Sequence, residues 1–118
     1  ETARRTFGEE HPRTIKATFN KASFLVETDR TAEAEPLCVD ALDRYAQIKG
    51  DDHVDTLRAV VLMGRLRMAQ GRHEDAKASF RDAAERRARV LGEDHPDTQS
   101  ARRLVAAASD AAKDDLTE

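Results

Sequence analysis

The sequence predicts an all-α fold in which pairs of helices stack into a solenoid. The first observation is a motif, LGEDHPDT at residues 91–98, that has related copies at residues 7–14 and 49–56. His11, His53 and His95 recur at intervals of 42 residues, and a fixed period of this kind is typical of units that bury their apolar faces against a neighbouring unit. The second observation is the composition: 39% of residues are hydrophobic, but there are only four Phe, one Tyr and no Trp. A core of small and aliphatic side chains, as between stacked helices, is therefore expected.

Each copy of the motif predicts the end of one helix and the start of the next. The glycines at positions 8, 50 and 92 can adopt the left-handed conformation that often follows a helix. Pro12 and Pro96 suit the first position of a helix, and the acids before them oppose the positive end of the helix dipole. The histidine of the motif is expected to cap this turn or to pack against it.

Helices are expected wherever apolar residues recur at helical spacing. The pattern gives five of them, over residues 12–28, 31–48, 54–70, 73–91 and 96–114. In the fourth, Ala76, Phe80, Ala83 and Val90 are expected to face inward.

The chain is expected to form one array over residues 1–118. Residues 1–7 align with residues 85–91, so they are expected to end the second helix of a preceding unit. Two units are expected to follow, at residues 12–48 and 54–91. Residues 96–115 are expected to form the first helix of a third unit or a helix that caps the array with a polar face.

The spacing of small residues within the units resembles the tetratricopeptide repeat. That pattern has a small residue in the first helix and Ala-x3-Phe in the second, and here Gly64 is followed by Ala76 and Phe80. The period of 42 residues, the motif itself, and the segments AEPL at 34–37 and QGRHEDA at 70–76 further resemble the repeats of the kinesin light chain family. The resemblance implies a right-handed tetratricopeptide solenoid, of about two full repeats plus flanking helices.

The resemblance also implies a concave groove lined mainly by the first helix of each repeat. The aligned positions on that face combine cations with apolar side chains, and Asn20 matches one of the asparagines that line the groove in kinesin light chain-like repeats. Glu27 and Asp110 are the only acids expected near it. The candidate peptide-binding residues are Lys16, Phe19, Asn20, Ser23, Arg58, Val61, Arg65, Met68 and Arg103. The alternative is that these cations are ordinary solvated residues.

We expect no metal site, no cofactor and no enzymatic activity. The motif histidines stand one repeat apart, too distant to share an ion, and His73 has no ligand partner three or four residues away. Cys38 is expected to be a packed small side chain, and a single cysteine fits a reducing, cytoplasmic compartment. A Gly-rich phosphate loop and a Ser/His/Asp arrangement are both missing from the sequence.

Neither nucleic acid nor a membrane is an expected partner. The net charge is −3, which gives no general attraction to polyanions. The basic run ERRAR at residues 85–89 contains interleaved acids and is expected to be a solvated helix face. No apolar run approaches the ~20 residues that span a bilayer.

The expected function is a non-catalytic protein-interaction scaffold that binds an extended acidic peptide with apolar anchors in the groove. An alternative is a sensor or oligomerisation segment of a larger signalling regulator, such as a nucleotide-binding multidomain protein. A further alternative is self-association through the apolar faces left open at the ends of the array.

Overall fold

The computed structural model of the chain describes residues 12–117, and that part is all-α. Its helices are α1 (Pro12–Glu27), α2 (Thr31–Lys49), α3 (Val54–Ala69), α4 (His73–Leu91) and α5 (Pro96–Thr117). The predicted fold class is confirmed, and each expected helix is found with its ends within three residues of the predicted ones. The helix end expected at residues 1–7 lies outside the described residues.

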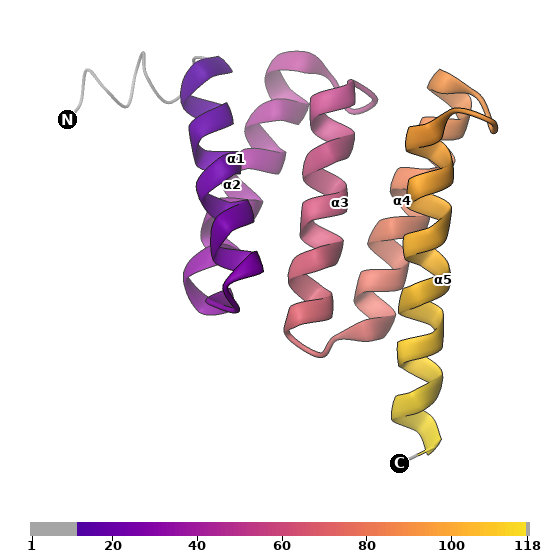
Figure 1. Cartoon of the computed structure of the whole chain (residues 1–118). Coiled ribbons are helices and arrows are strands. Elements are labelled where there is room, and N and C mark those ends of the chain that lie inside the picture. Colours follow the sequence, from indigo (N-terminus) through magenta and orange to yellow (C-terminus); the bar gives the residue numbers. More distant parts are fainter. Residues whose placement is uncertain (1–11, 118) are drawn as a thin grey trace.

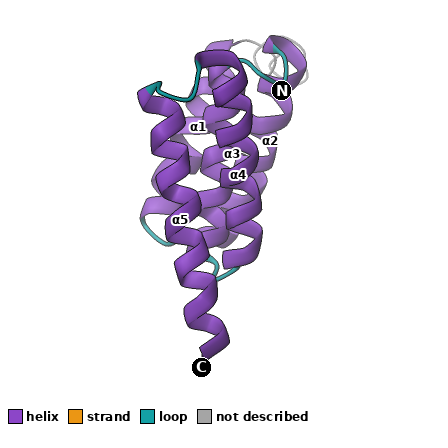
Figure 2. Cartoon of the chain, turned by 90° about the vertical axis from the view of Figure 1, so that its right-hand side faces the viewer, coloured by secondary structure: helices purple, strands orange, loops and turns teal. Residues whose placement is uncertain are grey.

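The helices are arranged in two layers (Figures 1 and 2). One layer holds α1, α3 and α5, and the other holds α2 and α4. Each helix of the second layer packs against two of the first, α2 against α1 and α3, and α4 against α3 and α5. Helices that are neighbours in sequence are thus neighbours in space, as in a solenoid.

Glycines in the left-handed region end α2 and α4. Gly50 has φ 97° and Gly92 has φ 99°, a conformation that costs a residue with a side chain more than it costs glycine. Each donates its N–H to the carbonyl four residues earlier, of Ala46 or Ala88, at 3.0 Å. The predicted helix stops are therefore confirmed at these two copies of the motif.

Histidines cap the helices that follow. The Nδ1 atom of His53 accepts the N–H of Asp55 at 3.0 Å, and Nδ1 of His95 accepts that of Asp97 at the same distance. Each bond satisfies one of the N–H groups that lack a partner at a helix N-terminus. The predicted capping role is confirmed for both, while His11 lies outside the described residues.

Small residues allow the two layers to approach closely. Ala22 of α1 and Cys38 of α2 are buried in one core cluster, and Phe80 of α4 is buried in a second. Around them lie the aliphatic side chains that complete the two clusters, Leu25, Leu62, Leu66, Val60 and Val61.

The inward face of α4 differs from the prediction at its C-terminal end. Val90 is 49% exposed, so its predicted inward position is wrong. The buried residues of α4 include Ala84 and Arg87 instead, and the stripe of buried positions ends one turn before Val90. Arg87, in the middle of the basic run, is therefore not part of a solvated face.

Candidate functional site

Two adjoining hollows open beside α1 and α3. The first has a volume of about 250 Å³ and is lined by Lys16, Phe19, Asn20, Tyr45, Lys49, Asp55 and Arg58. The second has a volume of about 350 Å³ and is lined by Phe19, Ser23, Val26, Glu27, Arg58, Val61, Leu62, Arg65, Arg87, Asp97, Ser100 and Leu104. Phe19 and Arg58 line both, so the two hollows form one surface, which we call the groove.

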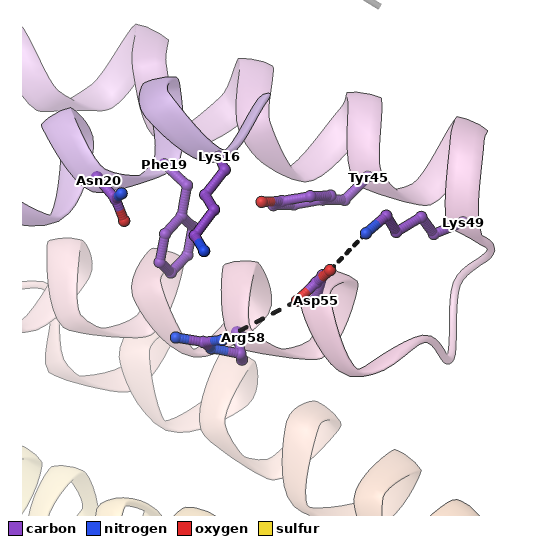
Figure 3. A pocket seen from close by; sticks show the side chains of 7 residues that line it. All are labelled: Lys16, Phe19, Asn20, Tyr45, Lys49, Asp55 and Arg58. Carbon is purple, nitrogen blue, oxygen red and sulfur yellow. Dashed lines mark hydrogen bonds and ion pairs between the residues drawn. The ribbon is translucent and has the colours of Figure 1, made fainter. Parts of the chain in front are cut away.

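Aromatic rings and cations alternate in the first hollow (Figure 3). Phe19 and Tyr45 meet edge to face, with ring centroids 6.3 Å apart. The guanidinium of Arg58 stands 5.8 Å from the centre of the Phe19 ring, and Nζ of Lys49 stands 5.6 Å from that of Tyr45. Cations at this distance are attracted by the ring quadrupole, so both are held beside apolar surface.

Asp55 links the cations on the two sides of the first hollow. Its carboxylate accepts a hydrogen bond from Nζ of Lys49 at 2.7 Å and lies 4.0 Å from the guanidinium of Arg58, as Figure 3 shows. The bond from Lys49 is the largest of several causes that lower the pKa of Asp55, and partial burial opposes it. Burial is also the main cause of the raised pKa of Tyr45, to which the charge of Asp55 adds. The phenol therefore keeps its proton to a higher pH than an exposed tyrosine does.

Three arginines line the second hollow. Arg58 and Arg65 come from α3 and are exposed, whereas Arg87 reaches it from α4 and is 8% exposed. Nη1 of Arg87 donates to the backbone carbonyl of Asp97, at the start of α5, at 2.9 Å. Burial is the first cause of the lowered pKa of Arg87, and the neighbouring charge of Arg58 acts in the same direction.

Most of the candidate residues lie together in the groove. Arg58, Phe19, Lys16 and Asn20 line the first hollow, and Ser23, Val61 and Arg65 line the second together with Phe19 and Arg58. Val61 is 8% exposed, so it contributes a floor rather than a protruding contact.

Two candidates are placed elsewhere. Met68 is half-buried and packs against the core cluster around Phe80, and it lines neither hollow. Arg103 is exposed on α5 but is not among the residues that line the groove. The residues of α5 that line it include Ser100 and Leu104.

The groove also holds residues that the sequence did not indicate. Tyr45 and Lys49 come from the second helix of the repeat, and Asp55 and Asp97 are acids beside a strip where only Glu27 and Asp110 were expected. The expectation about acids is therefore wrong. Asp55 and Asp97 occupy the same position in two copies of the motif, and this was the one signal that could have placed them.

Comparison with known protein families identifies the repeats. The family model described as tetratricopeptide repeat matches residues 20–55 and 61–97. The chain belongs to the tetratricopeptide repeat family. Tetratricopeptide repeats generally mediate protein–protein interactions, and the family consists typically of scaffolds without enzymatic activity. A comparison with curated proteins finds no match.

Among the residues that the structure describes, no three His, Cys, Asp or Glu side chains are grouped so that they could hold a metal ion. Over the same residues, none of the helices combines the length and the apolar character that crossing a membrane requires.

Proposed function

We propose that the groove binds an extended, acidic peptide segment that carries one or two apolar anchors. The observation that carries this proposal is the position of Arg58, which lines both hollows and stands 5.8 Å from the Phe19 ring. A cation and an aromatic face side by side suit a ligand in which acidic and bulky residues alternate.

The charge of the groove supports an acidic ligand. Its cations are Lys16, Lys49, Arg58, Arg65 and Arg87, and its acids are Glu27, Asp55 and Asp97. The groove thus has an excess of positive charge within a chain whose net charge is −3. Lys49 is paired with Asp55 at 2.7 Å and Arg87 is buried, whereas Lys16, Arg58 and Arg65 are exposed. These three exposed cations are the first that we assign to the ligand.

Apolar surface in both hollows supports the anchors. Phe19 is half-buried between them, Tyr45 contributes its ring to the first, and Leu104 of α5 contributes to the second. Burial of a bulky side chain in such a hollow contributes about 1.5–3 kcal/mol. The charged residues then determine how the peptide is oriented and which peptides are selected, and the apolar anchors supply most of the affinity.

We also propose that the repeats are of the kinesin light chain-like type and that the chain works in a reducing, cytoplasmic compartment. The interval of 42 residues between His53 and His95 supports repeats of the kinesin light chain-like type, and the buried free thiol of Cys38 supports a reducing, cytoplasmic compartment. The alternatives, a sensor or oligomerisation segment of a larger regulator or self-association through the ends, remain predictions.

The experiment that tests the location of binding is a map of backbone amide resonances. A degenerate peptide pool of Asp, Glu, Leu and Phe is titrated into the isotope-labelled chain, with a pool of Lys, Arg, Leu and Phe as the control. We expect the acidic pool alone to shift resonances of α1 and α3 around Phe19 and Arg58. Shifts centred instead on exposed residues of the other layer, such as Val39 and Arg81, would refute the groove assignment.

A further inference from the structure

The second hollow gathers an unusual number of hydrogen-bond donors. Three guanidinium groups, those of Arg58, Arg65 and Arg87, and two hydroxyl groups, those of Ser23 and Ser100, line a space of about 350 Å³. Each guanidinium carries five N–H donors in a rigid planar fork, and each hydroxyl can donate once. These donors come from α1, α3, α4 and α5, so the packing of the repeats brings them together.

The buried Arg87 makes this hollow more than a cationic stretch of surface. Arg87 is only 8% exposed, and its guanidinium donates to the backbone carbonyl of Asp97 rather than to a carboxylate. Burying a charge is costly unless an opposite charge compensates for it. The charge of Asp97 compensates only in part, because burial and Arg58 together still lower the pKa of Arg87. An anion placed in the hollow would reduce this cost further.

The chemistry of the lining favours a phosphoryl group over a carboxylate. Glu27 and Asp97 also line the hollow, so the three arginines leave an excess of only one positive charge. With so small an excess, directed hydrogen bonds must supply the selectivity. A phosphorylated side chain offers three acceptor oxygens where a carboxylate offers two, so it can accept from more of the guanidinium and hydroxyl donors at once.

We propose that the second hollow is a subsite for a phosphorylated serine or threonine of the bound peptide. Arg65 and Arg87 hold the phosphoryl oxygens, and Arg58 lies between this subsite and the aromatic first hollow. This inference rests on the proposed function, because it specifies the chemical nature of one acidic residue in the same ligand. Phosphorylation of the partner would then act as the signal that strengthens binding.

The test uses three fluorescent peptide pools that differ at one central residue. That residue is phosphoserine, glutamate or serine, and the flanking positions are degenerate mixtures of Asp, Glu, Leu and Phe. Affinity is measured by anisotropy for the wild type, for Arg65→Gln, for Arg87→Gln and for Arg81→Gln. Arg81 is exposed on α4 and lines neither hollow, so it is the matched control. Thermal unfolding of each variant accompanies the titrations, because Arg87 is buried.

We expect the wild type and Arg81→Gln to bind the phosphoserine pool about tenfold more tightly than the glutamate pool, as charge-assisted hydrogen bonds of ordinary strength would give. Arg65→Gln, at an exposed position, should lose this preference while keeping its thermal stability. Equal affinity for the phosphoserine and glutamate pools would overturn the phosphate subsite and leave the proposed function intact. A preference for phosphoserine over glutamate that survives in Arg65→Gln would also overturn the phosphate subsite, and so would one that survives in an Arg87→Gln variant that still folds.

Two further controls distinguish a failure of the phosphate subsite from a failure of the proposed peptide-binding function. If the glutamate pool binds no more tightly than the serine pool and a basic pool binds equally well, the proposed acidic-peptide function itself fails. A single-stranded oligonucleotide of similar length that binds as tightly as the phosphoserine pool would show that the arginines select any phosphate backbone. That result would overturn the proposal in favour of a nucleic-acid ligand.

Discussion

The ring of Phe80 on α4 occupies the space that a side chain at Gly64 on α3 would need. A Cβ atom built at position 64 would lie 2.4 Å from Cε1 and 2.6 Å from Cδ1 of that ring, well inside van der Waals contact. At the corresponding positions of the preceding repeat, the pair is Ala22 and Cys38, both buried. A larger residue on one helix is thus matched by a smaller one on the other.

This contact predicts that Gly64→Ala destabilises the fold. Alanine is the better helix former by about 1 kcal/mol, but overpacking of a core costs about 1–3 kcal/mol. We therefore expect the free energy of unfolding, measured in urea, to fall by about 1 kcal/mol. In the background of Phe80→Leu, Gly64→Ala should lower the free energy of unfolding by less, because the ring that it meets is gone. A Gly64→Ala variant as stable as the wild type would contradict the close packing.

The turn between α1 and α2 predicts a stabilising substitution. Asp29 has φ 62° and is the one described non-glycine residue in the left-handed region, and the matching position of the next repeat is Gly71, with φ 79°. Because the left-handed conformation costs a residue with a side chain about 1 kcal/mol, Asp29→Gly should raise the free energy of unfolding by about 0.5–1 kcal/mol. Asp29→Ala, which keeps the steric cost, is the matched control. A lower melting temperature for Asp29→Gly would contradict this prediction.

The pair of Lys49 and Asp55 predicts a dependence of stability on acid. The pKa of Asp55 is lowered from its ordinary 3.8, so the unfolded state takes up this proton at a higher pH than the folded state. The stabilisation is therefore complete above the ordinary pKa and is lost as the pH falls through the lower, folded value. We expect the wild type to exceed Asp55→Asn by about 1 kcal/mol near neutral pH.

Chemical denaturation of the two proteins at a series of pH values measures this difference. It should be constant above the ordinary pKa of 3.8 and should shrink below it. Lys49→Met should produce a smaller loss than Asp55→Asn, because Asp55 keeps the charge of Arg58 4.0 Å away, and the double variant should lose less than the sum of the two. A difference that grows on acidification would have the wrong sign and would exclude the ion pair as its source.

The buried thiol of Cys38 predicts slow modification and a loss of stability in alkali. Burial raises its pKa from 9.0 to about 11, so at pH 8 the folded chain holds about 100-fold less thiolate than the unfolded chain. Iodoacetamide should therefore react at least that much more slowly with the native protein than with the protein in denaturant. Because the unfolded state loses this proton first, stability should fall as the pH rises from 9 towards 11. A native rate equal to the denatured rate would contradict the burial of Cys38.

The features of the fold that depend on short spacings were predictable from the sequence. Gly64 and Phe80 followed the repeat pattern, and the motif predicted both the positive φ of Gly50 and Gly92 and the capping role of His53. These follow from local backbone chemistry and from the period of the helix, which act over a few residues.

The walls of the groove were predictable only in part. Lys16, Phe19, Arg58 and Arg65 were found from the first helix of each repeat. Tyr45 and Lys49 approach from α2, and Arg87 from α4, because long side chains cross between layers in a way that depends on three-dimensional packing. Arg87 lies in a run of charged residues that is usually solvated, and only its three-dimensional surroundings, its burial and its contact with the carbonyl of Asp97, distinguish it.

Reversal of charge in the groove tests the central claim most directly. The measurement is the affinity of the acidic peptide pool for the wild type, for Arg58→Glu/Arg65→Glu, and for Arg81→Glu/Lys113→Glu. The last variant reverses two exposed cations that line neither hollow, so it matches the change in net charge. We predict a loss of more than about tenfold in the groove variant, since like charges now face the ligand, and little change in the control. Undiminished affinity in Arg58→Glu/Arg65→Glu, or an equal loss in both variants, would contradict binding in the groove.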